Sequence, residues 1–152
     1  MESTLRKLPP KIKIYEALGA IADHRVELEG LLGTQGKCYS ASTKGKSYTI
    51  SYDPETNVIV SNDSGSTNQG YLGYPAVAFL LKMGKLPYDP QFLIMLKAIN
   101  WQEIKEQVNK DHEATLRVLL GMLFQEGFDV DALAEECDRI EQELENLKVK
   151  KE

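Results

Sequence analysis

The residues that could do chemistry gather in a polar loop near the middle of the chain. Residues 61–70 read Ser-Asn-Asp-Ser-Gly-Ser-Thr-Asn-Gln-Gly. Gly65 and Gly70 have the glycine spacing of a phosphate-binding loop, which continues with Lys and then Ser or Thr to reach the phosphates and magnesium. Here Tyr71 and Leu72 follow. The motif therefore lacks the residues that carry its chemistry.

A weaker anion-binding geometry survives, because the backbone N–H groups of this loop precede a predicted helix. We therefore interpret the loop of residues 61–75 as a candidate site for a small molecule or an anion. The candidate ligand-binding residues are Asn62, Asp63, Ser64, Ser66, Gly70 and Tyr74. The alternative is a flexible connection between a strand and a helix, with no polar side chain suited to a core.

The two histidines and two cysteines form no recognisable catalytic or metal site. His24 follows Asp23, and His112 follows Asp111, but neighbouring side chains on a helix point apart and do not make a dyad. Cys38 and Cys137 belong to no C-x-x-C motif and share no ligand spacing with the histidines. The sequence therefore predicts no catalytic residue, no metal and no cofactor, and it favours a non-enzyme over an enzyme.

The composition is that of an ordinary globular protein. The chain has 152 residues, of which 42% are hydrophobic and 27% charged, and we expect one domain over residues 1–152. No apolar stretch approaches the ~18 residues that cross a bilayer. A net charge of −5 disfavours nucleic acid, because affinity for phosphates comes from Lys and Arg. Two isolated cysteines and no secretion signal predict a cytoplasmic protein.

The periodicity predicts an α+β fold. An N-terminal helix over residues 11–24 precedes an antiparallel β-meander of three to four strands, and the C-terminal half holds four to five helices. We expect strands at residues 26–29, 37–42, 47–53 and 58–61, and helices at 76–83, 90–99, 101–108, 112–126 and 129–150. Asn100, Asp111 and Asp129 are the expected N-caps of the last three helices. Residues 1–9 are expected to form a flexible tail.

The clearest single pattern is an apolar stripe in the last predicted helix. Its spacing of three and four residues gives one narrow apolar face, and the residues of this interaction stripe are Val130, Leu133, Ile140, Leu144 and Leu147, with Cys137 between them. Two alternatives stay open. The stripe packs on residues 116–124 within the monomer, or it pairs with its twin in a homodimer.

Residues 37–87 resemble the ββα unit of SWIM-type zinc fingers. The likeness rests on the hairpin strand of residues 47–52, the strand of residues 58–61, and the helix of residues 76–81 that leads to Gly84-Lys85-Leu86-Pro87. The family binds zinc through Cys-x-Cys and Cys-x-His, and the matching segments here, residues 59–63 and 73–75, contain neither Cys nor His. The resemblance implies a metal-free version of an interaction module.

Two functional hypotheses follow. The first is a non-catalytic protein-interaction or regulatory module, which acts as a homodimer or with another protein partner. The second is a small-molecule or anion-binding protein, or an enzyme, that uses the loop of residues 61–75.

Overall fold

The structure is a computed structural model that describes residues 4–151, and it confirms the predicted α+β class. After helix α1 (Lys11–Ala22) the chain forms an antiparallel meander. Its strands are β2 (Val26–Glu29), β3 (Gln35–Tyr39), β4 (Ser47–Asp53) and β5 (Val58–Ser61). Gly45 (φ 83°) and Asn57 (φ 58°) supply the left-handed backbone of the two turns that flank β4.

Two short strands at the ends of the chain extend this sheet. β1 (Thr4–Leu5) pairs with β6 (Lys150–Lys151), and β6 runs parallel to β5, so the strand order is β1-β6-β5-β4-β3-β2. Neither strand is predicted from the sequence, because two residues are too few to show an alternating pattern.

Residues 4–9 take part in the fold, which differs from the expected flexible tail. The guanidinium of Arg6 donates hydrogen bonds to the carbonyl oxygens of Ser66 at 2.7 Å and Ile59 at 3.0 Å. The Lys7 N–H donates to the carbonyl of Gly70 at 3.1 Å. Residues 1–3 of the expected tail lie outside the described residues.

The second half of the chain is helical, as predicted. Its elements are the π-helical turn η1 (Gly65–Gln69), α2 (Tyr74–Lys82), the 3₁₀ helix η2 (Pro90–Leu96), α3 (Trp101–Gln107), α4 (His112–Gln125) and α5 (Val130–Leu147). The expected N-caps are confirmed, because Asn100, Asp111 and Asp129 each accept a hydrogen bond from a backbone N–H three residues on, at 3.1, 2.8 and 3.0 Å.

The helix expected over residues 90–99 is shorter and tighter than predicted. It ends at Leu96, and Lys97 is extended while Ala98 has a left-handed backbone with φ 58°. The carboxylate of Asp23 accepts a hydrogen bond from the Ala98 N–H at 2.7 Å, which provides this N–H with a partner outside the helix. The hydrogen bond between Asp23 and Ala98 joins residues far apart in the chain, so the local periodicity of the sequence cannot predict it.

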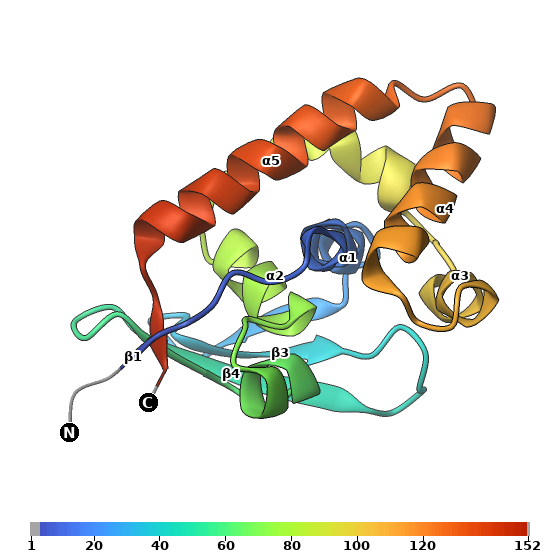
Figure 1. Ribbon diagram of the computed structural model, residues 1–152. Helices are drawn as coiled ribbons and strands as arrows, with labels where there is room; N and C mark the ends of the chain where they lie inside the picture. Colours follow the sequence, from blue (N-terminus) through green and yellow to red (C-terminus); the bar gives the residue numbers. More distant parts are fainter. Residues whose placement is uncertain (1–3, 152) are drawn as a thin grey trace.

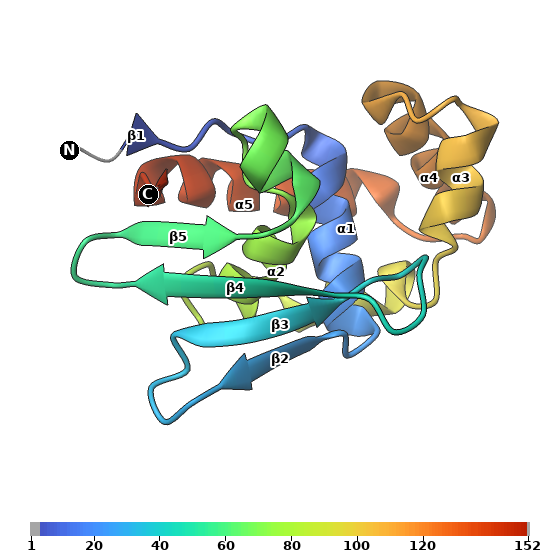
Figure 2. The ribbon, with the colours of Figure 1, turned by 90° about the horizontal axis from the view of Figure 1, so that it is seen from below.

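The elements form layers, which Figure 1 shows edge-on. α1 and α2 cover one face of the sheet, and α5 crosses above them on the side away from the strands. α1 is buried nearly all round, from Ile12 to Ala22. α2 packs closely against the sheet at Gly36, where an added Cβ atom would come within 2.9 Å of the Phe79 ring. Among residues 4–151, no helix covers the opposite face of the sheet (Figure 2).

The apolar stripe of α5 packs inside the monomer. Leu133, Ile140 and Leu144 are buried, and Val130 and Leu147 are partly buried against the same core. α5 lies mainly across α1, where Asp138 accepts a hydrogen bond from Lys11 at 2.7 Å, and it contacts α4 less. The prediction that residues 116–124 form its main partner is therefore wrong. A homodimer stays a prediction, and it would need a surface other than this stripe.

Candidate ligand-binding site

The predicted loop site is held together by its own side chains. Asp63 is buried, and its carboxylate accepts hydrogen bonds from the Ser66 N–H at 3.0 Å and the Ser66 hydroxyl at 2.8 Å, together with one from the Ser61 hydroxyl. The expectation that no polar side chain here suits a core is wrong. Three buried polar residues satisfy one another, which removes the cost of their burial.

The other predicted residues do not converge on one cavity. The side-chain oxygen of Asn62 accepts a hydrogen bond from the Thr49 N–H at 2.9 Å, Ser64 is exposed, and Gly70 ends η1 with φ 77°. Only Tyr74 lines the pocket described below, which contains neither Asp63 nor His24. A ligand role for the loop residues stays a prediction.

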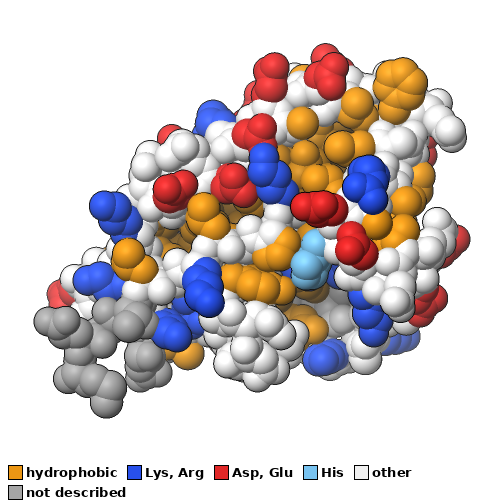
Figure 3. Space-filling model, viewed as in Figure 1, with side chains coloured by type: hydrophobic (Ala, Val, Ile, Leu, Met, Phe, Trp, Pro, Cys, Tyr) orange, Lys and Arg blue, Asp and Glu red, His pale blue; other side chains and the backbone are white. Residues whose placement is uncertain are grey.

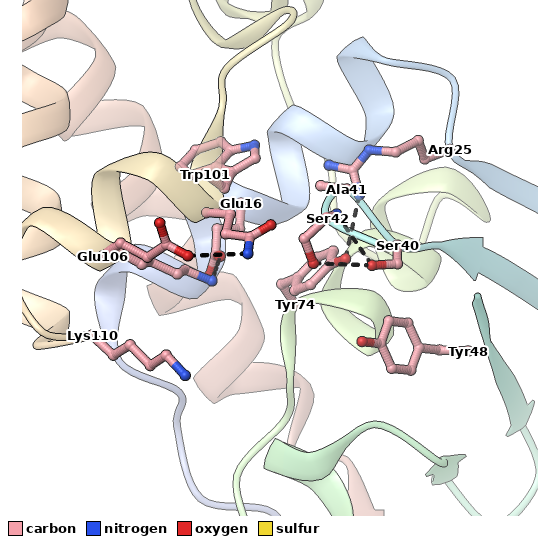
Figure 4. Close-up of a pocket in the computed structure, with 12 residues that line it drawn as sticks. Glu16, Arg25, Ser40, Ala41, Ser42, Tyr48, Tyr74, Trp101, Glu106 and Lys110 are labelled. Carbon is pink, nitrogen blue, oxygen red and sulfur yellow. Dashed lines mark hydrogen bonds and ion pairs between the residues drawn. The ribbon is translucent and has the colours of Figure 1, made fainter. Parts of the chain in front are cut away.

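The chain has a pocket of about 330 Å³ between α1, the turn after β3, and α3 (Figure 4). This size lies in the range of small-molecule sites. Its walls combine charged, aromatic and small polar side chains. The lining residues are Glu16, Arg25, Ser40, Ala41, Ser42, Tyr48, Tyr74, Trp101, Gln102, Lys105, Glu106 and Lys110.

Glu16 is a buried carboxylate on the pocket's inner wall. It is 2% exposed, and it forms ion pairs with Lys13 of α1, at 3.2 Å, and with Lys105 of α3. A buried charge needs such partners, because burying an unpaired ion in a protein costs on the order of several kcal/mol. Lys105 therefore links α3 to α1, and the two lysines together compensate the negative charge of Glu16.

Arg25 enters the pocket from the end of α1 and crosses the face of Tyr74. One guanidinium nitrogen, Nη1, donates to the Tyr39 carbonyl at 2.9 Å and to the Tyr74 hydroxyl at 3.3 Å. The guanidinium carbon lies 5.7 Å from the centre of the Tyr74 ring, a cation–π distance. Burial raises the pKa of Tyr74 above its ordinary value, so the hydroxyl stays protonated at neutral pH.

Three N–H donors around this pocket have no acceptor within residues 4–151. They are Nε and Nη2 of Arg25 and Nε1 of Trp101, all closed to solvent. The carboxylate of Asp23 lies 3.8 Å from Arg25 Nε, too far for a hydrogen bond. A buried donor without a partner costs about 1–3 kcal/mol, so three together mark a place where an acceptor is favoured.

Aromatic side chains form a closely packed part of the pocket wall. Trp101 is 3% exposed and packs against Gly19, where a Cβ atom would come within 2.8 Å of the indole ring. Tyr48 meets Tyr74 edge to face, with ring centres 6.4 Å apart. Figure 4 shows Lys110 on the side opposite Tyr48.

Sequence reasoning missed this pocket, because its residues come from several separate segments and show no common spacing. Two signals were present. Glu16 stands alone as an acid in the apolar run of residues 14–22, and Trp101 is the single tryptophan of the chain. A charged residue in a helix that is apolar on all sides indicates a buried ion pair or a site.

A second hollow, of about 720 Å³, lies where α4 faces the start of α1. Ile12, Leu116 and Leu120 give it an apolar lining, and His112 and Arg117 lie at its border. Burial and the nearby charge of Lys13 lower the pKa of His112. Figure 3 shows the apolar surface between α4 and α5 on this side of the molecule, bordered by charged side chains.

Two further findings concern the described residues alone. Residues 4–151 contain no group of three or more His, Cys, Asp or Glu side chains placed to hold a metal ion. None of their helices is both long and apolar enough to cross a membrane.

The comparisons with known proteins place the chain in a family but give that family no activity. No curated protein and no solved structure matches the chain. The model of one family covers residues 6–150, which include the whole pocket. The chain belongs to the family described as Uncharacterised conserved protein UCP014422.

Proposed function

We propose that this protein binds a small anionic molecule in the pocket between α1, the turn after β3, and α3. The observation that carries the proposal is the excess of donors: Arg25 and Trp101 present three buried N–H groups without an acceptor. This revises the small-molecule hypothesis of the sequence analysis, because it moves the site from the loop of residues 61–75 to a pocket that shares only Tyr74 with it.

The charges around the pocket support an anion. Arg25, Lys105 and Lys110 line it together with Glu16 and Glu106. Because Glu16 already pairs with Lys13 and Lys105, its charge does not repel a ligand strongly. Nε and Nη2 form one edge of the Arg25 guanidinium, and this edge fits the two oxygens of a carboxylate or phosphate.

The body of the ligand would meet aromatic rings. Tyr48, Tyr74 and Trp101 offer flat surfaces, and the volume of about 330 Å³ limits the ligand to the size of a small metabolite. Residues 40–42, in the turn after β3, form one wall of the pocket. The pocket's buried carboxylate is ion-paired on both oxygens, which favours binding over acid–base catalysis.

A cytoplasmic location belongs to the same proposal. Both cysteines are free and buried, which suits a reducing compartment.

The test is a thermal-shift and fluorescence titration with benzoate, glutarate, inorganic phosphate and adenosine monophosphate. We expect saturable stabilisation by at least one probe, by about 2.7 kcal/mol at a hundred times its Kd. The same probe should change the fluorescence of Trp101, the only tryptophan, which locates binding in the pocket.

The matched variants are Arg25→Lys and Lys82→Ala. Arg25→Lys keeps the charge but removes the two-donor edge, so we expect at least a tenfold weaker affinity. Lys82 lies exposed on α2 outside the pocket, and its variant should bind like the parent. Stabilisation that is equal in all three proteins, or absent with every probe, would refute the proposal.

A further inference from the structure

Lys110 lines the pocket with a charge that no neighbouring side chain pairs. The other lining cations are engaged, because Lys105 pairs with Glu16 and Arg25 donates two hydrogen bonds. Within residues 4–151 the Lys110 ammonium takes part in no ion pair and no side-chain hydrogen bond. Figure 4 shows Lys110 and Arg25 on opposite sides of the pocket. A molecule bound at Arg25 would therefore have a second cation at its other end.

The backbone that carries Lys110 is unfavourable for a lysine. Asn109 and Lys110 have φ 54° and 62°, and no other two successive non-glycine residues in the described part of the chain are both left-handed. The Lys110 N–H donates to the carbonyl of Lys105 at 2.7 Å, which ends α3 in this conformation. Glycine adopts it without the steric cost of a Cβ atom. Residues held in such conformations cluster at functional sites, so a lysine here indicates that its side chain serves the pocket.

The charge around the pocket exceeds what one acidic group would balance. Cations predominate among the side chains that line the pocket or that form an ion pair or cation–π contact with a lining side chain. The cations are Lys13, Arg25, Lys46, Lys105 and Lys110, and the carboxylates are Glu16, Asp23 and Glu106. Two positive charges are left over, although the whole chain carries −5. A ligand with two negative charges would compensate them, whereas a monoanion would compensate only one.

We propose that the pocket selects a small molecule with an acidic group at each end, one bound by Arg25 and Trp101 and the other by Lys110. This inference rests on the proposed function and adds the class of ligand. The acidic groups are carboxylates or phosphates, since an ammonium is a point charge that pairs with either. Lys110 is exposed, so an acidic group reaches it directly from solvent. Tyr48 and Tyr74 would cover the part of the ligand between its two ends.

The test compares glutarate with its monoamide, which has the same length but a single negative charge, by isothermal titration calorimetry at neutral pH. We expect the full chain to bind glutarate at least tenfold more tightly than the monoamide. Lys110→Gln removes the charge, so it should weaken glutarate binding about tenfold and leave monoamide binding unchanged. Phosphoglycolate, titrated in the same way, shows whether one end prefers a phosphate, and its binding should depend on Lys110 equally.

Two glycine variants separate a binding role of Lys110 from a structural one. Lys110→Gly and Asn109→Gly both relieve a left-handed backbone, so both should raise the unfolding temperature, with the smaller rise at Asn109 because asparagine tolerates this conformation better. Asn109 does not line the pocket, and its variant should bind glutarate like the parent. Lys110→Gly should bind glutarate about tenfold more weakly despite its higher stability. A lysine that only ended α3 would not combine these two effects.

Three results would overturn the inference. Equal binding of glutarate and its monoamide, both weakened in Arg25→Lys, would show a pocket for one acidic group and leave the proposed function intact. Equal glutarate affinities of Lys110→Gly and Asn109→Gly would remove Lys110 from the site. If benzoate binds and neither glutarate nor phosphoglycolate does, the two-acid ligand alone is refuted, whereas failure of every probe refutes the proposed function as well.

Discussion

Two helix-interior glycines give a matched pair of variants that tests the packing of the pocket. Gly19 lies in α1 and Gly121 in α4, and neither has a positive φ. On propensity alone, alanine at either position should stabilise the protein by about 0.5–1 kcal/mol, because it reduces the conformational freedom of the unfolded chain. The structure predicts that only one of them does so.

At Gly121 an added Cβ meets nothing within 4 Å, so Gly121→Ala should show the full gain. At Gly19 the Cβ would lie 2.8 Å from Cζ2 and 3.2 Å from Nε1 of Trp101. The indole is buried and cannot turn aside, so it must shift, and overpacking of this kind costs about 1–3 kcal/mol. The propensity gain offsets part of this cost, which leaves a net loss of up to about 2.5 kcal/mol.

The assay is urea denaturation followed by circular dichroism, with thermal unfolding as a second measure. We expect a higher midpoint for Gly121→Ala and a lower one for Gly19→Ala, with unchanged m values. In temperature, each kcal/mol corresponds to about 2–4 °C for a chain of this size. The Trp101 fluorescence should change in Gly19→Ala alone. If Gly19→Ala were as stable as Gly121→Ala, the close contact between α1 and Trp101 would be refuted.

Two other predictions concern buried polar groups. Asp63→Ala leaves Ser61 and Ser66 without their acceptor, so it should lower the free energy of unfolding by about 3–5 kcal/mol in urea denaturation. Asn62→Ala loses one exposed hydrogen bond and should lower it by no more than about 1 kcal/mol. Similar losses in the two variants would contradict the buried hydrogen bonds of Asp63. Burial raises the pKa of the Cys38 thiol from 9.0 to about 12. Between these two pH values the folded protein keeps the thiol proton, whereas the unfolded chain releases it. The contribution of the buried thiol to folding stability is therefore fully present below pH 9 and is lost as the pH rises from 9 towards 12. Iodoacetamide at pH 8.5 should therefore label Cys38 slowly in buffer and fast in urea, measured by mass spectrometry, and equal rates would contradict its burial.

The sequence by itself determined the elements whose signals are local. The alternation of residues 47–52 gave β4, and Asn100, Asp111 and Asp129 began their helices as N-caps. Gly84 (φ 89°) and Gly127 (φ 91°) follow the ends of α2 and α4, where a left-handed residue is needed. These features depend on backbone dihedrals and on hydrogen bonds a few residues apart, so a short window of sequence contains their cause.

Only the tertiary structure decided which distant groups meet. The narrow apolar stripe of α5 needs one other helix to cover it. Any apolar helix face could do so, because the hydrophobic effect has no direction. That α5 packs mainly on α1 and less on α4 depends on how all the helices pack together. The pocket follows the same logic, since Glu16, Arg25, Tyr74 and Trp101 come together only when α1, α2 and α3 have docked. Hydrophobic burial is non-directional, so composition and periodicity fix what is buried, while the complete fold fixes which polar side chains are left facing one another.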